Sequence, residues 1–150
     1  MRVKFMIPGE PKGKGRPRVE RHGDRTVTRT PDDTIIYENL VRTEYQRQCG
    51  GHRFQDGAQL DLRVIAYYPI PSSKSKKQQQ LMESGAIRPT KKPDTDNVLK
   101  VIADSLNQIA YKDDAQVVDA SVRKFYSRNP RTVVCISEVP PRSLGGRCAV

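Results

Sequence analysis

The sequence predicts one α+β domain, a small mixed β-sheet packed with about three helices. Some segments alternate apolar and polar residues as strands do, and others repeat apolar residues at helical spacing. Their order along the chain is strand, helix, strand, helix, helix, strand, strand, which is typical of α+β domains. The 150 residues suffice for one hydrophobic core but not for two. Residues 1–140 form the expected domain, and residues 141–150 a loosely ordered tail.

The first half of the chain predicts a strand, a loop, a helix and a second strand. Residues 3–7 alternate apolar and polar side chains, which predicts a strand. The glycines and prolines of residues 9–18 predict a flexible basic loop. Asp33 is the expected N-cap of a helix that runs to about Gln48. Residues 60–68 alternate again and predict the second strand.

The second half predicts two helices followed by two strands. Residues 74–84 are very polar and predict a short helix that ends before a glycine. Residues 97–110 form the clearest helix, because their apolar side chains make one stripe and their polar side chains lie opposite. Residues 115–127 and 131–139 predict strands joined by an Asn-Pro turn.

The charge of the chain is strongly positive and unevenly placed. The net charge is +10 and the isoelectric point is near 9.8, which indicates a polyanionic partner. The local net charge is +6 in residues 1–31 and +5 in residues 72–92, but −4 in residues 93–119. This reversal favours a phosphate-binding protein with a cation site inside it. The alternative is that both basic segments are only solvated surface.

Two acidic pairs flank the predicted helix of residues 97–110. If the chain is extended before the helix, Asp94 and Asp96 project from the same side of the backbone. Lys100 lies one helical turn later. Neighbouring carboxylates repel, and Mg²⁺, which prefers carboxylate, water and phosphate oxygens, would relieve that repulsion. A tight return after the helix would bring Asp113 and Asp114 beside the first pair.

Each of these residues also has a purely structural interpretation. Asp96 is a candidate helix N-cap, and Lys100 a candidate i+4 ion-pair partner for it. Asp113 and Asp114 are candidates for a plain turn. All three interpretations would have to hold together in a strongly basic protein, which weakens them jointly.

The sequence also favours a cytoplasmic location. It contains no apolar run of 18 residues or more, so no membrane association is expected. Its three cysteines are odd in number and lack metal-ligand spacing, which is typical of a reduced cytosolic protein.

The segments PDTDNVLKVIADSL and YKDDAQVVD resemble the signature D-x-D-N-x-x-K-x-x-x-D-x-L…D-D-x-Q of RusA-type Holliday-junction resolvases. The resemblance extends over most of the chain and implies a RusA-like, homodimeric endonuclease fold for residues 1–140. It implies three metal-binding aspartates, Asp94, Asp96 and Asp114, and a lysine needed for cleavage, Lys100. Asp113 is then an auxiliary acid at the metal, while Asp104 and Gln116 match the pattern as supporting residues.

The expected function is that of a Mg²⁺-dependent, structure-specific endonuclease that resolves four-way DNA junctions by paired symmetric nicks in recombination and repair, with Mn²⁺ as a substitute ion. Basic side chains are expected to contact backbone phosphates. These are Lys12, Lys14, Arg16, Arg18, Lys74, Lys76, Lys77, Lys91 and Lys92. Two alternatives remain: a less selective metal-dependent nuclease acting on flaps or other branched nucleic acids, and a DNA-binding protein without catalytic activity.

Overall fold

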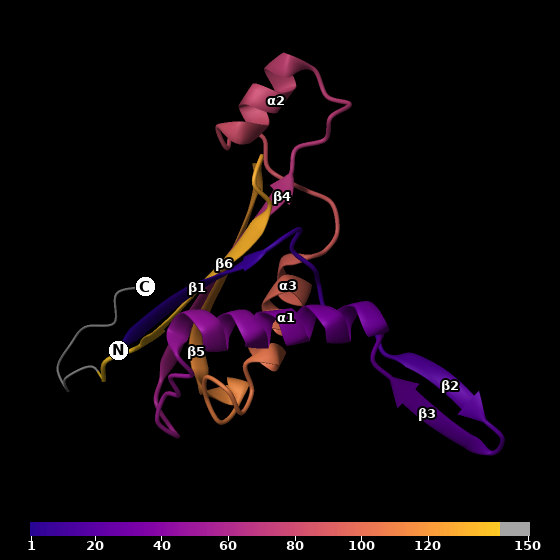
Figure 1. Cartoon of the computed structure of the whole chain (residues 1–150), viewed down its shortest axis with the longest axis vertical. Helices are drawn as coiled ribbons and strands as arrows, with labels where there is room; N and C mark the ends of the chain where they lie inside the picture. The colour runs from indigo at the N-terminus through magenta and orange to yellow at the C-terminus, as the bar shows by residue number, and fades with distance from the viewer. Residues whose placement is uncertain (142–150) are drawn as a thin grey trace.

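A computed structural model describes residues 1–141 and confirms the α+β class, with a mixed sheet and three α-helices (Figure 1). The elements are β1 (Arg2–Pro8), β2 (Arg18–His22), β3 (Arg25–Arg29), α1 (Asp32–Cys49), β4 (Leu60–Pro69), α2 (Lys76–Glu83), α3 (Thr95–Ser105), the short 3₁₀ helix η1 (Asp114–Gln116), β5 (Val117–Ser127) and β6 (Arg131–Glu138). The predicted tail lies outside the described residues from residue 142 onward. None of the helices in the described part of the chain combines the length and the apolar character needed to cross a membrane.

The main sheet has four strands in the order β1-β6-β4-β5. Strand β6 pairs antiparallel with both β1 and β4, whereas β4 and β5 run parallel. The parallel pair needs a crossover connection, and residues 70–116 supply it with α2 and α3.

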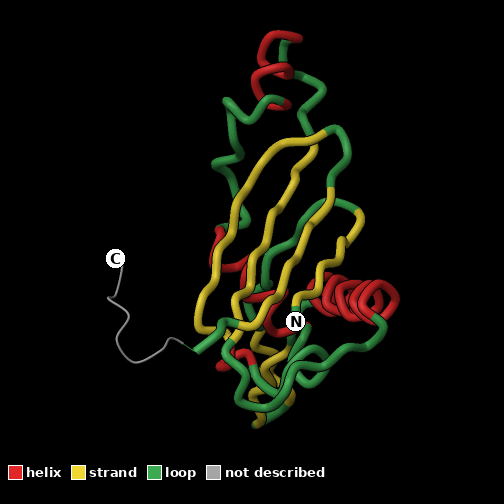
Figure 2. The backbone as a smooth tube through the Cα atoms, turned by 90° about the vertical axis from the view of Figure 1, so that its left-hand side faces the viewer, coloured by secondary structure: helices red, strands yellow, loops and turns green. Residues whose placement is uncertain are grey.

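Helices α1 and α3 pack against one face of this sheet, and within residues 1–141 no helix covers the other face (Figure 2). Alternation along the strands decides which side chains enter the core; in β1, Val3, Phe5 and Ile7 are buried while their neighbours are exposed. The same buried cluster includes, from the two helices, Tyr37, Val41, Tyr45, Val98, Val101 and Ile102.

Helix α1 ends where the sequence predicts but begins differently. Gly50, with φ of +62°, terminates it just after Cys49. The predicted N-cap at Asp33 is wrong, because Pro31 takes that position without a side-chain cap and Asp33 lies inside the first turn. An acid there still interacts favourably with the positive end of the helix dipole.

Strands β2 and β3 form a separate hairpin, where the sequence pattern had predicted no strands. Its pairing runs from Arg18–Arg29 at the base to His22–Arg25 at the tip. The turn is Gly23-Asp24, with Gly23 at φ of +61°, a backbone conformation that favours glycine.

Helix α3 is shorter than predicted, because it ends at Ser105 rather than Ala110. Gln108 adopts a left-handed φ of +66°, and its backbone N–H bonds the carbonyl of Tyr111 at 2.8 Å. The apolar spacing continues past Ser105 because Leu106 is still a core residue, although it no longer belongs to the helix.

Candidate metal centre and nucleic-acid interface

Helix α3 carries most of the predicted acidic site. Its apolar side is buried in the core, which leaves Asp96, Lys100 and Asp104 at four-residue intervals along the other side. Asp96 and Lys100 are exposed, and Asp104 is half-buried. Eight residues separate Asp96 from Asp104, an axial distance of about 12 Å. The polar residues of the motif are therefore spread along the helix.

The segment that enters α3 is fixed to strand β5 by Lys124. Its ammonium donates to the carbonyl oxygens of Lys91 at 2.6 Å and Pro93 at 2.9 Å. Asp94 then has extended backbone angles, and the helix begins at the next residue. The expectation that Asp94 and Asp96 share an extended segment is therefore wrong, since Asp96 already lies in the first helical turn.

At the start of α3, the side chains of Asp94, Asp96 and Lys100 form neither an N-cap hydrogen bond nor an ion pair with one another. Asp94 occupies the N-cap position without making a side-chain cap hydrogen bond, and Asp96 is not the N-cap. The ion pairs among residues 1–141 do not include one between Asp96 and Lys100. These three charged groups are available to a ligand from solvent.

The second acidic pair lies in a firmly held turn at η1. The Oε1 atom of Gln116 accepts from the backbone N–H groups of Lys112 at 3.1 Å and Asp113 at 3.4 Å. Its Nε2 group donates to two carbonyl oxygens of loop 55–58, at 3.0 and 3.2 Å. Asp113 and Gln116 also form a reciprocal capping box. Gln116 therefore fixes the position from which Asp114 projects.

Asp114 belongs to a cluster of three carboxylates. Its backbone N–H bonds Oδ1 of Asn107 at 2.8 Å, which holds the turn against the end of α3. Partial burial, hydrogen bonding to Asp113 and the negative charges of Asp104 and Asp113 raise the pKa of Asp114 above its ordinary 3.8. Burial and the same carboxylates also raise the pKa of Tyr111. Negative charge is thus concentrated here without full compensation.

Lys14 is enclosed between two acids. Its ammonium lies 2.8 Å from Oε1 of Glu38 and 3.2 Å from Oδ2 of Asp104, and the three side chains are 20%, 11% and 24% exposed. Burial lowers the pKa of Lys14, but the hydrogen bonds to both carboxylates outweigh it and raise that pKa above 10.5. The backbone N–H of Lys14 also bonds the carbonyl of Asn97 at 3.0 Å. Lys14 is therefore an internal ion-pair partner in this state.

The basic loop before the hairpin has no regular structure, as predicted, but it is closely packed. A Cβ atom on Gly13 would lie 2.6 Å from Cβ of Pro93, so only glycine fits this approach. The backbone N–H of Gly15 bonds Oγ1 of Thr34 at 3.0 Å. The loop is thus fixed to both α1 and α3.

The other predicted phosphate contacts are exposed and occupy three places. Lys12, Arg16 and Arg18 lie in the basic loop and at the start of β2; Lys91 and Lys92 precede α3; Lys74, Lys76 and Lys77 lie at α2. Helix α2 extends beyond the sheet, at the top of Figure 1, whereas the hairpin projects from the lower end.

Residues 1–141 contain no preassembled group of three or more His, Cys, Asp or Glu side chains suited to a metal ion. The structure brings Asp114 together with Asp104 and Asp113, and it leaves Asp94 and Asp96 toward the other end of α3. Mg²⁺ is commonly held by one or two carboxylates together with water and phosphate oxygens. The crowded carboxylates at Asp114 therefore fit a hard divalent cation whose coordination is completed by water and DNA.

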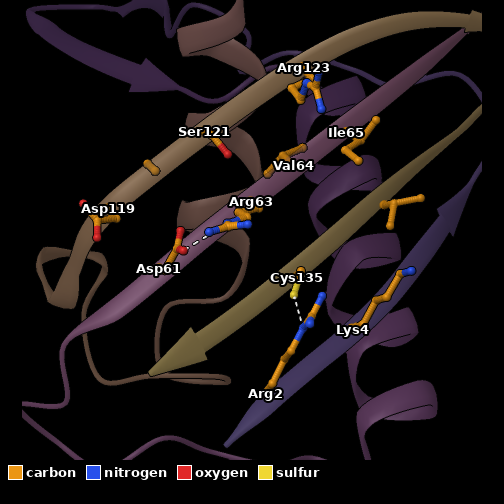
Figure 3. Close-up of a pocket in the computed structure, with 12 residues that line it drawn as sticks. Arg2, Lys4, Asp61, Arg63, Val64, Ile65, Asp119, Ser121, Arg123 and Cys135 are labelled. Carbon is orange, nitrogen blue, oxygen red and sulfur yellow. Dashed lines mark hydrogen bonds and ion pairs between the residues drawn. The ribbon is translucent and has the colours of Figure 1, made fainter. Parts of the chain in front are cut away.

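A cavity of about 610 Å³ lies on the uncovered face of the sheet, separate from these acids (Figure 3). It is lined by charged groups that include Arg2, Lys4 and Arg123. Part of the charge is already paired, since Nε of Arg63 lies 3.0 Å from Oδ2 of Asp61. None of the predicted site residues lines this cavity.

Two residues at the acidic site were missed from the sequence. Glu38 is buried on the same side of α1 as Val41 and Tyr45, and an acid on that apolar stripe was the available signal. Asn107 gave no such signal, because its bond to Asp114 depends on where α3 ends.

Comparisons with known proteins agree with the motif. Residues 8–137 match the family described as "Endodeoxyribonuclease RusA". A relative from Bacillus subtilis (strain 168), "Uncharacterized protein YqaN", is 38% identical over 137 residues, which cover 91% of this chain and 96% of that protein. The chain therefore belongs to the RusA endodeoxyribonuclease family.

Proposed function

We propose that this protein is a Mg²⁺-dependent, structure-specific endonuclease that resolves four-way DNA junctions by paired symmetric nicks, in recombination and repair in the cytoplasm. Membership of the RusA family supports a DNA-cleaving activity, and the net charge of +10 supports a nucleic-acid substrate. The observation that carries the proposal is the group of crowded carboxylates around Asp114 in an otherwise strongly basic protein.

Asp94, Asp96 and Asp114 are the proposed ligands of Mg²⁺, with Asp113 as an auxiliary ligand and Mn²⁺ as a substitute ion. Because Asp94 and Asp96 lie toward the other end of α3 from Asp114, binding of the ion would have to bring these side chains together. A bound divalent ion supplies polarisation of a phosphoryl oxygen and activation of the attacking water. The protein contributes two exposed carboxylates at the start of α3 and a third that Asn107 and Gln116 hold in place.

Lys100 is the proposed partner of the reacting phosphate. Its exposed ammonium lies on the same side of α3 as the acids and has no acidic partner among the ion pairs of residues 1–141. It would neutralise the negative charge that develops on the phosphate in the transition state.

The exposed lysines and arginines would bind DNA backbone phosphates, which gives affinity without sequence information. Lys14 differs from the others, because it already binds Glu38 and Asp104. Its proposed part in DNA binding is to hold the basic loop on α3, so that Lys12 and Arg16 meet the phosphates.

The protein would act as a homodimer. A four-way junction has two-fold symmetry, and a C2 dimer presents two equivalent sites related by the same symmetry. Two such sites would make the paired nicks that resolution requires.

A synthetic mobile four-way junction, labelled on each strand in turn, tests the proposal. We expect paired nicks at symmetric positions with Mg²⁺ and none with EDTA, and flap or duplex competitors should inhibit weakly. Equal cleavage of flaps would indicate the less selective nuclease. Junction binding without cleavage in Mg²⁺ or Mn²⁺ would indicate a DNA-binding protein without catalytic activity.

A further inference from the structure

Hairpin β2–β3 makes almost no contribution to the core. Every residue of its two strands is exposed except the half-buried Glu20, and even Val19 and Val27 are 68% and 44% exposed. Figure 1 shows the hairpin projecting beyond the first turn of α1, away from the sheet. An isolated two-stranded hairpin is only marginally stable in water. The structure therefore offers no folding role for this arm.

The arm is strongly basic, and its acids are already engaged in part. Residues 18–29 contain four arginines against two acids, a local net charge of +2. Glu20 interacts with His22 at 3.2 Å and Arg29 at 4.0 Å, and Arg29 also pairs with Asp32 at 3.3 Å. Arg29 is thus neutralised within the hairpin and the start of α1.

Three other arginines lie along the arm: Arg18 at the base, Arg25 at the tip and Arg21 one position before the tip. Because side chains alternate along a strand, Arg18 and Arg25 share one face of the ribbon and Arg21 projects from the other. All three are exposed, and none has an acidic partner among the ion pairs of residues 1–141. Uncompensated guanidinium groups on both faces of an exposed ribbon are suited to phosphate binding.

The loop that leads into the arm is fixed to the acidic site. Lys14, four residues before the hairpin, binds Asp104 at 3.2 Å, and Asp104 lies in the carboxylate cluster of Asp114. The Gly15–Thr34 hydrogen bond ties the same loop to α1. DNA whose scissile phosphate lies at the cluster would therefore extend past the base of the arm on one side.

The dimensions of the arm match a DNA duplex. Five residues in each strand give a ribbon about 17 Å long. At about 3.4 Å per base pair, that length corresponds to roughly five base pairs. The major groove of B-DNA admits a two-stranded β-ribbon.

We propose that hairpin β2–β3 is a DNA-binding arm, which lies along the major groove of the duplex next to the branch point and holds its phosphates with Arg18, Arg21 and Arg25. The inference rests on the proposed function for the identity of its ligand, a branched DNA. It assigns an affinity role to an element that carries none of the proposed metal ligands.

The triple variant Arg18→Gln, Arg21→Gln, Arg25→Gln tests the arm. Its matched control is Arg47→Gln, Arg53→Gln, Arg128→Gln, which removes the same charge from exposed arginines that are paired with acids elsewhere. Fluorescence anisotropy of a labelled junction in EDTA, over a salt series, gives the slope of log affinity against log salt. We expect the slope of the arm variant to be shallower than that of the parent by about 0.9 for each arginine–phosphate contact removed, and we expect the control to keep the parental slope.

Hydroxyl-radical footprinting of the bound junction gives a second measurement. The parent should protect roughly five base pairs more on an arm of the junction than the arm variant does. Melting temperatures of parent and arm variant should agree, because the hairpin buries little. A parental slope and footprint in the arm variant, or an equal loss in the control, would overturn the inference.

The two proposals can fail separately. If the parent binds junctions through the arm but never cleaves them with Mg²⁺ or Mn²⁺, the DNA-binding arm stands and the endonuclease does not. If the parent cleaves and the arm variant binds with the parental slope, the endonuclease stands and the arm does not.

Discussion

At the scale of single residues, the variant Asp96→Asn distinguishes a metal-binding role of Asp96 from a structural role. The structure gives Asp96 neither an N-cap position nor an ion pair with Lys100, so Asp96→Asn should leave the melting temperature in EDTA unchanged or slightly higher. Loss of a residue that only hydrogen-bonds a metal ligand already lowers metal affinity or activity by about 10- to 100-fold. We therefore expect single-turnover junction cleavage to fall by more than about 100-fold, with junction binding retained.

The matched control for this variant is Asp56→Asn, which removes an acid that is 63% exposed and lies outside both the carboxylate cluster and the uncovered face of the sheet. It should cleave like the parent. Cleavage retained in Asp96→Asn, or lost equally in Asp56→Asn, would contradict the assignment of Asp96 as a ligand.

Asp114 makes a prediction about pH. Its pKa is raised, so the folded protein binds this proton more tightly than the unfolded chain does. Ionisation of Asp114 therefore destabilises the metal-free fold. This destabilisation is absent below the ordinary pKa of 3.8, and it is complete once the pH has risen through the pKa of Asp114 in the folded protein. In EDTA, Asp114→Asn should be more stable than the parent at about pH 7 and should lose that advantage at about pH 3.

Urea unfolding of both proteins at the two pH values measures this difference. Mg²⁺ should also raise the melting temperature of the parent more than that of Asp114→Asn, since binding to the folded state stabilises it. A stability difference that does not change with pH would show that burial and the neighbouring carboxylates do not raise the pKa of Asp114.

At the scale of elements, Lys14 joins the basic loop, α1 and α3. Lys14→Met would leave Asp104 part-buried without a cation, beside Glu38, which would keep only Arg42 at 3.3 Å. Breaking a fully buried pair costs about 3–5 kcal/mol; since Lys14 is 20% exposed, a loss of about 2 kcal/mol is expected. The double variant Lys14→Met, Asp104→Asn should recover most of it.

Urea unfolding checks this prediction, and Lys12→Met is the control, because Lys12 is an exposed neighbour in the same loop. Its free energy of unfolding should stay within about 0.5 kcal/mol of the parent value. Equal stability of the two single variants would mean that the ion pairs do not anchor the loop.

The elements also show what sequence could and could not predict. Periodicity placed the main strands and the polar side of α3, because alternation and helical spacing are local properties. The true end of α3 was not predictable from spacing, since Leu106 remains in the core after the helix has ended. Hairpin β2–β3 did have a local signal, Gly23-Asp24 between β-branched residues. The Lys14–Asp104 pair joins residues 90 positions apart, which no local pattern reports.

At the scale of the whole molecule, the uncovered face of the sheet is the surface best suited to a second copy. Met6, Val133 and Ile65 lie in one row across three strands, and Met6 is 40% exposed. Lys4 on β1 and Asp119 on β5 lie at opposite edges of this face. A two-fold axis parallel to the strands would place β1 over β5 of the partner and bring these opposite charges together.

We therefore expect light scattering at micromolar concentration to give twice the 17.0 kDa mass of the chain. Ile65→Glu would bury a charge in the apolar row, so it should yield monomers that remain folded, because the side chain points away from the helices. Ile36→Glu is the control, since Ile36 is 67% exposed on α1 and lies off this face. A fully active 17.0 kDa parent would contradict the homodimer itself. Dissociation by Ile36→Glu but not by Ile65→Glu would place the interface on α1, because only the surface that two copies share is sensitive to a buried charge.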